Sequence, residues 1–185
     1  ESVQYAIEGI LNNSREEVEK TFEMEKKVNQ IQRQLLAFLV KLSKESLNED
    51  ERNKVTNLIY AVNDIERISD HGENIAELGR DLINENLSLS EHAEDEIREI
   101  YNLAINNFTD SMKCLEEINL QLRKQVHENE RQVDLLEIGY RNHHLQRLND
   151  GKCTVDSGVI YFDILNNLER ISDHSKNIAD YSYDI

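Results

Sequence analysis

One segment of this chain occurs twice, and the repetition limits the folds that are open to it. Residues 63–77 read NDIERISDHGENIAE, and residues 166–180 read NNLERISDHSKNIAD. The runs Glu-Arg-Ile-Ser-Asp-His and Asn-Ile-Ala are identical, whereas Gly72-Glu73 of the first copy is Ser175-Lys176 in the second. A repeat of this kind predicts two similar structural units. Because polar residues persist while their neighbours differ, the segment indicates a site rather than a solvated face.

The composition predicts that both units are helical. The 185 residues include no proline and only six glycines, so hairpin turns have almost no sequence basis. The longest purely apolar run, residues 35–40, is far shorter than the roughly 20 residues of a membrane-spanning helix. We therefore expect an all-α protein that does not insert this segment into a membrane.

The charge and cysteine content restrict the partners and the compartment. A net charge of −16 would repel nucleic acid and anionic lipid, so cations and basic proteins are the expected partners and nucleic acid is not. Two cysteines, Cys114 and Cys153, are too few for a disulfide scaffold and fit a reducing compartment. We predict a cytoplasmic location.

Apolar periodicity divides the chain into two units, residues 1–86 and 87–185, around a linker at 84–90. The expected long helices cover 14–44, the stretch from the polar break at 47–49 to about 83, 91–117, 120–148, and a last helix that carries the second copy. A capping box at Ser14 starts the first of these, and Asp156 or Ser157 is expected to cap the last.

The first unit is expected to lack most of its first helix. Glu25-Lys26-Lys27-Val28-Asn29 aligns with Glu130-Arg131-Gln132-Val133-Asp134 at nearly the same distance from the repeated segment. That register makes residues 1–12 the counterpart of only the end of the helix at 91–117, as in a domain cut from a larger protein. The predicted fold is all-α, with two pseudo-symmetric three-helix bundles and a truncated first helix.

A stripe of polar side chains follows each copy of the repeat. Four residues fall within an arc of roughly 80° on a helix: Asn63, Glu66, Asp70 and Asn74, repeated as Asn166, Glu169, Asp173 and Asn177. Two carboxylates one turn apart repel by a few tenths of a kcal/mol unless a cation offsets the repulsion. A hard cation bound between two helices would offset this repulsion and explain why the pair of carboxylates recurs.

The preceding helix of each unit supplies the expected second wall of the site. It reads Glu130, Asp134 and Glu137 in the second unit, and Glu25, Asn29 and Gln32 in the first. With four carboxylates against three, the second site should bind a cation more tightly. Ion pairs to Arg67 and Arg170 are the alternative, since acidic helix faces are common without metal. His71 and His174 should pack or donate hydrogen bonds rather than ligate, and His127, His143 and His144 are assigned to the surface.

The repeated motif closely resembles the E(D)xxxD signature of the PhoU family, and Glu130-xx-Val133-Asp134-xx-Glu137 is similar to the acidic motif on that family's preceding helix. The resemblance covers nearly the whole chain except residues 1–12. It implies two three-helix bundles, a regulatory role in phosphate transport, and multinuclear iron or zinc. Carried over by position, the metal ligands would be Glu25, Glu66 and Asp70 in one site and Glu130, Asp134, Glu169 and Asp173 in the other.

Residues 151–165 look most like the C-terminal PhoU-like domain of bacterial sodium/phosphate cotransporter proteins. This resemblance implies a cytoplasmic domain at the inner face of the membrane, in contact with the membrane region of a phosphate transporter. The alternative is a free-standing regulator that contacts subunits of a phosphate ABC transporter and a sensor kinase, and a homo-oligomer is compatible with both.

Two further classes of protein remain to be weighed. A di-iron carboxylate oxidase would need Glu-xx-His pairs, and no Glu here has a His three residues later. A glycine-rich phosphate loop and a nucleophile arrangement are also absent from the sequence. We therefore predict a non-enzymatic protein, with a metal-free helical adaptor as the third possibility.

Overall fold

Six helices make up the described part of the chain, residues 1–117 and 119–182, in the computed structural model. In chain order they are α1 (Ser2–Leu11), α2 (Arg15–Leu42), α3 (Glu49–Asn84), α4 (Glu91–Glu116), α5 (Leu120–Asn149) and α6 (Val155–Tyr181). The predicted all-α fold is confirmed. None of the described helices combines the length and apolar character that a membrane span requires.

Side-chain caps explain where most of these helices begin. The Ser14 hydroxyl accepts a hydrogen bond from the backbone N–H of Glu17 at 3.4 Å. The Ser14 N–H donates to the Gly9 carbonyl and not to the Glu17 side chain, so only half of the predicted capping box forms. Asn48 and Glu51 form a reciprocal capping box at the start of α3. The predicted cap of α6 was wrong: Thr154 caps the helix by accepting from the N–H of Ser157 at 3.3 Å, so α6 starts earlier than expected.

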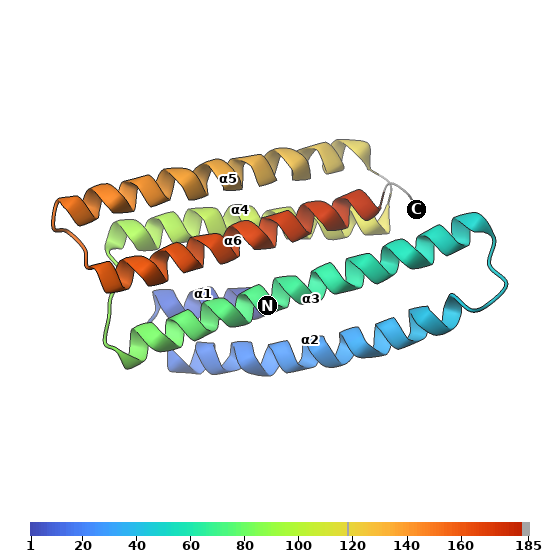
Figure 1. The fold of residues 1–185 in the computed structure, drawn as a ribbon, viewed down its shortest axis with the longest axis horizontal. Coiled ribbons are helices and arrows are strands. Elements are labelled where there is room, and N and C mark those ends of the chain that lie inside the picture. The colour runs from blue at the N-terminus through green and yellow to red at the C-terminus, as the bar shows by residue number, and fades with distance from the viewer. Residues whose placement is uncertain (118, 183–185) are drawn as a thin grey trace.

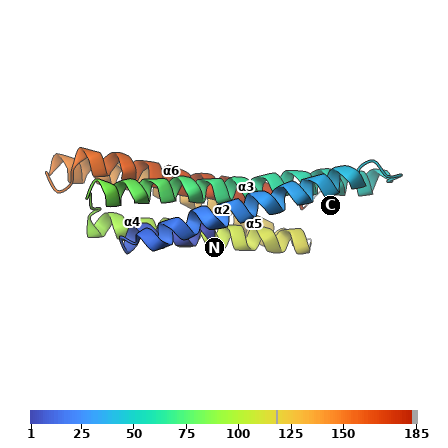
Figure 2. The same ribbon diagram turned by 90° about the horizontal axis from the view of Figure 1, so that it is seen from below.

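The two copies of the repeat lie next to each other in the middle of a long, flat molecule. Helices α3 and α6 carry the copies and pack side by side (Figure 1). Helices α1 and α2 contact α3, whereas α4 and α5 contact α6, which produces two three-helix bundles. Figure 2 shows the flatness of the assembly from below. The predicted boundary between residues 86 and 87 falls in the connection from α3 to α4.

The two bundles differ in the length of their first helix. Helix α1 has 10 residues, whereas α4 has 26. The hairpin of α2 and α3 therefore extends well past the N-terminal end of α1, toward the right of Figure 1. Within the residues described, α1 is much shorter than α4, as the register of the sequence predicts.

A close helix approach fixes α1 against the repeat in α3. A Cβ atom at Gly72 would lie 3.1 Å from the backbone nitrogen of Val3 and 3.2 Å from its Cγ2 atom. The aligned Ser175 on α6 is also fully buried, and its hydroxyl donates to the carbonyl of Ile171 at 2.7 Å. The small residue at Gly72 lets α1 approach the side of the repeat that lies away from the polar stripe.

Candidate functional site

The carboxylates of the polar stripe on each repeat face the second helix of their own bundle, whereas the Asn74 amide donates to Asn167 on the other repeat at 3.3 Å. In the first bundle the Gln32 amide on α2 donates to the Asn63 side-chain oxygen on α3 at 3.3 Å. In the second bundle the Lys176 ammonium on α6 contacts the Glu130 carboxylate on α5. We call Glu25, Glu66, Asp70 and Glu73 the first cluster, and Glu130, Asp134, Glu169 and Asp173 the second cluster.

The second cluster brings three predicted ligands into reach of one ion. Carboxylate oxygens of Glu130, Asp134 and Asp173 lie within 4.8 Å of one another. Oδ1 of Asp134 is buried without a hydrogen-bond partner. Burial raises the pKa of Asp134, and the charges of Glu130 and Asp173 raise it further. A buried carboxylate oxygen of this kind is costly unless a donor or a cation meets it.

Glu169 adds a fourth carboxylate to the electrostatics of the second cluster. Burial raises its pKa, and the charge of Asp173 adds to the effect. From the exposed side, Arg170 lies 3.4 Å from Glu169 and 3.3 Å from Asp173. The ion pairs considered as an alternative to metal are therefore present at the edge of this cluster.

A lysine that the sequence reasoning did not assign to the site also enters the second cluster. The Lys176 ammonium contacts Glu130 and lies 3.9 Å from Oδ1 of Asp173. Burial lowers the pKa of Lys176, but its contact with Glu130 and the nearby carboxylates raise it by more. The signal was its position three residues after Asp173, on the same face of the helix. The second cluster thus contains its own cation.

The first cluster has the same frame but a different charge pattern. Glu25 is buried as deeply as its counterpart Glu130, and the Asn29 amide donates to it. Burial raises the pKa of Glu66, and Asp70 and then Glu25 also raise it. Glu73 stands at the position of Lys176, with a pKa raised by burial and by Glu25. Within the described residues, this cluster does not bring three ligand atoms as close together as the second does.

The two histidines of the repeat connect the bundles rather than join the clusters. The rings of His71 and His174 stack with centroids 5.4 Å apart. Nδ1 of His71 lies 2.8 Å from the Asn167 oxygen, and Nδ1 of His174 lies 2.7 Å from Oδ1 of Asp64. Burial lowers the pKa of His71. The predicted packing and hydrogen-bonding role is confirmed.

His144 does not lie on the surface, so that prediction was wrong. The ring is buried, with centroids 5.1 Å from those of both Tyr161 and Phe162. It fits there because a Cβ atom at Gly158 would lie only 2.3 Å from its Nε2 atom. The prediction failed because His144 lies on α5, whereas the space that its ring fills is beside Gly158 on α6. His127 and His143 have exposed or half-exposed side chains that bond Asp180 and Glu96.

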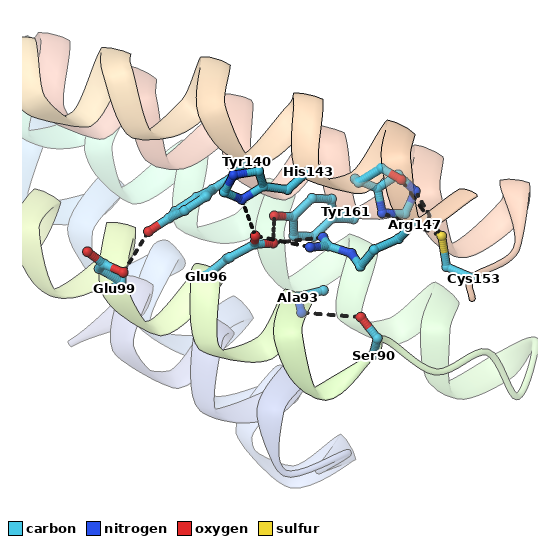
Figure 3. A network of polar contacts seen from close by, with 10 residues as sticks. Ser90, Ala93, Glu96, Glu99, Tyr140, His143, Arg147, Cys153 and Tyr161 are labelled. Carbon is cyan, nitrogen blue, oxygen red and sulfur yellow. Dashed lines mark hydrogen bonds and ion pairs between the residues drawn. The ribbon is translucent and has the colours of Figure 1, made fainter. Parts of the chain in front are cut away.

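A polar network that the sequence did not indicate joins the three helices of the second bundle (Figure 3). Glu96 on α4 accepts two hydrogen bonds from Arg147, at 3.0 and 2.7 Å, and one from the Tyr161 hydroxyl at 2.5 Å. Nδ1 of His143 lies 2.9 Å from the same carboxylate. Burial raises the pKa of Glu96, but these donors lower it by more. Protein donors already bond both oxygens of the Glu96 carboxylate, so the network holds the three helices together.

The fold and the paired clusters define a class: duplicated all-α proteins with carboxylates on the second and third helices of each bundle. A model of the PhoU domain matches residues 1–79 and 97–182, so the chain belongs to the PhoU domain family.

Known relatives agree with this assignment. The chain is 23% identical over 182 residues to the phosphate-specific transport system accessory protein PhoU homolog 1 of Thermotoga maritima, covering 97% of this chain and 77% of that protein. The PhoU structure from Pseudomonas aeruginosa has a TM-score of 0.78 at 20% identity, over 98% of this chain and 86% of that one. The phosphate transport system regulatory protein PhoU of Streptococcus pneumoniae has a TM-score of 0.85 at 18% identity, over 98% and 84%.

Proposed function

We propose that this protein is a regulator of phosphate transport that acts through contacts with other proteins and catalyses no reaction itself. The observation that carries the proposal is the PhoU family match, which spans both bundles. The relatives from Thermotoga and Streptococcus are named as an accessory and a regulatory protein of phosphate transport systems. Those names favour the free-standing regulator over the cotransporter domain that residues 151–165 suggested. The expected partners are cytoplasmic surfaces of a phosphate transporter and a sensor kinase.

Deleting the gene in its own organism tests this function. Phosphate uptake should no longer fall when phosphate becomes plentiful, and a plasmid copy of the gene should restore the response. The measurement is uptake of radioactive phosphate by cells grown in low and in high phosphate. An unchanged response in the deletion strain would contradict a regulatory role.

We also propose that the carboxylate clusters bind di- or trivalent cations, iron or zinc among them. All seven sequence-predicted ligands are carboxylates, a donor set that suits hard cations, and the unpartnered Oδ1 of Asp134 lies among them. A bound cation would link α5 to α6, or α2 to α3. In the second cluster it must compete with Lys176, which opposes the ranking that counts carboxylates alone. That ranking stays a prediction.

Calorimetric titration of metal-stripped protein with Zn²⁺ and Mn²⁺ tests cation binding. Asp173→Asn should weaken binding at the second cluster, and Asp70→Asn should weaken it at the first. The two variants then show which cluster gives the tighter phase. Wild-type protein without any binding heat would leave the clusters as ion pairs and solvated carboxylates, with the regulatory proposal unaffected.

A further inference from the structure

The outer face of α2 carries basic side chains that the protein itself does not neutralise. Residues 26–44 contain five Lys and Arg and no Asp or Glu, although the whole chain has a net charge of −16. On a helix, the four of them that lie within α2 fall in an arc of roughly 120°, opposite the buried Thr21 and Leu39. We call the five exposed basic residues the basic stripe: Lys26, Lys27, Arg33, Lys41 and, just after the end of α2, Lys44.

The charges of the basic stripe have no partner within the protein. Most of the other Lys and Arg residues form ion pairs with carboxylates, such as Arg147 with Glu96. In the part of the chain that the structure describes, no side chain of the stripe forms an ion pair or a hydrogen bond. Like charges along one helix face repel each other and do not stabilise the fold. The stripe therefore points to an anionic partner outside the protein.

The second bundle, whose three helices are all long, is also exposed on this face but is not basic there. With Glu25 aligned on Glu130, the stripe corresponds to five exposed residues of α5: Arg131, Gln132, Ile138, Gln146 and Asn149. Their exposure follows from the place of α2 and α5 at opposite edges of the flat molecule (Figure 1). Only one of these five residues is basic, and Arg131 pairs with Glu128 at 3.4 Å. The unpaired charges are therefore a property of the first bundle alone.

The spacing of the stripe indicates the shape of its partner. Lys26, Arg33 and Lys41 follow one another at intervals of about two helical turns, over about 22 Å of α2. A shallow hollow of ≈ 330 Å³ lies at the start of the stripe, lined by Lys26, Asn29, Gln30, Arg33 and Gln34. A carboxylate that enters this hollow meets two cations and three amide groups as hydrogen-bond donors. A helix fits the whole stripe, since it presents carboxylates along a straight line of this length.

Acidic residues at both ends of the stripe limit the length of the partner. Glu19 and Glu23 are exposed on the same face of α2 before the stripe, and Glu45 and Glu49 are exposed after it. An anionic membrane, which is flat and extended, would approach these carboxylates together with the cations and be repelled by them. A protein segment of limited length meets the cations alone.

We propose that the basic stripe binds an acidic helix of another protein. The helix lies along α2, with Asp and Glu at every third or fourth position so that they face the cations. Such charge pairs steer association and set the orientation of the partner, and salt weakens them. The net charge of the chain predicts basic partners, whereas the stripe selects an acidic one. This inference rests on the proposed function, because it names a surface through which a non-catalytic regulator contacts its partner.

A labelled model peptide tests the proposal on the purified full chain. The probe is a fluorescein-labelled helical peptide of alanine and glutamine with Glu at every third or fourth position, and the control peptide has Gln at those positions. Fluorescence anisotropy at low salt should show at least about tenfold tighter binding of the acidic peptide. The difference should disappear at about 1 M salt, where charges are screened within about 3 Å. Equal affinities, or no binding of the acidic peptide, would overturn the proposal.

Two double variants with the same change in net charge locate the binding surface. Lys26→Gln with Arg33→Gln should weaken binding of the acidic peptide by about tenfold or more. Arg98→Gln with Lys124→Gln is the matched control, since both residues are exposed on the second bundle, and it should leave binding nearly unchanged. Equal weakening by the two double variants would mean that binding follows the net charge of the chain, which contradicts the proposal.

A second pair of stripe residues guards against a loss of folding. Lys27→Gln with Lys41→Gln should also weaken binding of the acidic peptide, and it replaces the first pair if circular dichroism shows that the first pair has lost helix. The peptide measurement and the phosphate-uptake response of the deletion strain are independent of each other. A failure of this inference therefore differs from a failure of the proposed function.

Two other results would assign the stripe to a different occupant. The first is binding of the wild-type chain to phosphatidylglycerol vesicles that Lys26→Gln with Arg33→Gln abolishes, which would indicate a membrane surface. The second is a dimer, seen by analytical ultracentrifugation, that the same double variant dissociates, which would indicate a second copy. Either result, together with an acidic peptide that does not bind, contradicts the proposal.

Discussion

The two bundles are alike near the carboxylate clusters and unlike toward the ends of their hairpins. Glu25 and Glu130 are buried to the same degree at aligned positions of α2 and α5. At the far ends, a polar network around Glu96 in the second bundle faces α4. The first bundle has apolar side chains at the aligned positions: Leu35, Phe38, Leu42 and Leu58. The two bundles therefore share a frame of carboxylates but carry different side chains at aligned positions near the ends of their hairpins.

The clusters themselves differ at one position of the repeat. Lys176 contributes an ammonium group to the second cluster, whereas Glu73 contributes a further carboxylate to the first. The same frame therefore carries two different net charges. Cation binding is the property on which this difference should have the largest effect, because it acts directly on the charge that a cation meets.

The largest expected effect comes from breaking the network that closes the second bundle. Glu96→Leu would leave the buried Arg147 guanidinium without its carboxylate, which should lower the free energy of unfolding by about 3–5 kcal/mol. Urea denaturation measures the change. Glu99→Leu, which removes only the 2.7 Å hydrogen bond from the Tyr140 hydroxyl, is the control and should cost clearly less. Equal losses would show that the Glu96 network does not close this bundle.

A smaller loss is expected where α1 approaches the first repeat. Gly72→Leu would force side-chain atoms into the backbone of Val3 and should destabilise the protein by ~1–3 kcal/mol. Gly139→Leu on α5 is the control, because a Cβ atom there meets nothing within 4 Å. Thermal unfolding followed by circular dichroism compares the two. An unchanged melting temperature for Gly72→Leu would mean that α1 does not pack tightly on α3.

Single substitutions can change the charge difference between the two clusters. Lys176→Met removes the competing ammonium group and should raise the affinity of the second cluster for Mn²⁺ by about tenfold, or ~1.4 kcal/mol. Glu73→Lys places an ammonium group in the first cluster and should weaken binding there. Isothermal calorimetry on metal-stripped protein measures both. If Lys176→Met weakened binding instead, Lys176 would hold the carboxylates in place for the cation rather than compete with it.

The smallest expected effect is on the pH dependence of stability. It concerns the second bundle alone, because His144 is aligned with Leu39 in the first bundle, which does not titrate. Burial and the Arg147 charge lower the pKa of His144 from its ordinary value of 6.5. As pH falls through that value, the unfolded chain takes up a proton that the folded protein does not, so the free energy of unfolding falls. His144→Leu should reduce this acid-side loss.

Urea denaturation above and below the ordinary histidine pKa checks the prediction. His92→Leu, which replaces an exposed histidine on α4, is the control and should leave the pH dependence close to that of the wild type. A His144→Leu variant that lost as much stability toward acid as the wild type would mean that other groups govern this pH range.

The sequence predicted the helices well because their signals are local. The periodicity of apolar residues gave every long helix, and Ser14 with Glu17 gave the start of α2. The start of α6 was missed because several residues near it can cap a helix, and only the backbone conformation selects Thr154. The candidate carboxylates could be placed on one face of each helix for a similar reason, since their spacing along the chain sets that face, and their binding of a cation stays a prediction.

Contacts between helices could not be read in the same way. Whether Lys176 reaches Glu130, or His144 enters the space beside Gly158, depends on how two helices are rotated and how closely they approach. The Glu96 network likewise joins residues from α4, α5 and α6, which have no fixed spacing in the chain.

The sequence by itself determined that the protein is helical, duplicated and equipped with paired carboxylates at helical spacing, because each of these properties depends on residues within a few turns of one another. The tertiary structure decided which charges meet and which histidines are buried. Those outcomes depend on packing between segments far apart in the chain, where a change in rotation of one helix exchanges one set of neighbours for another.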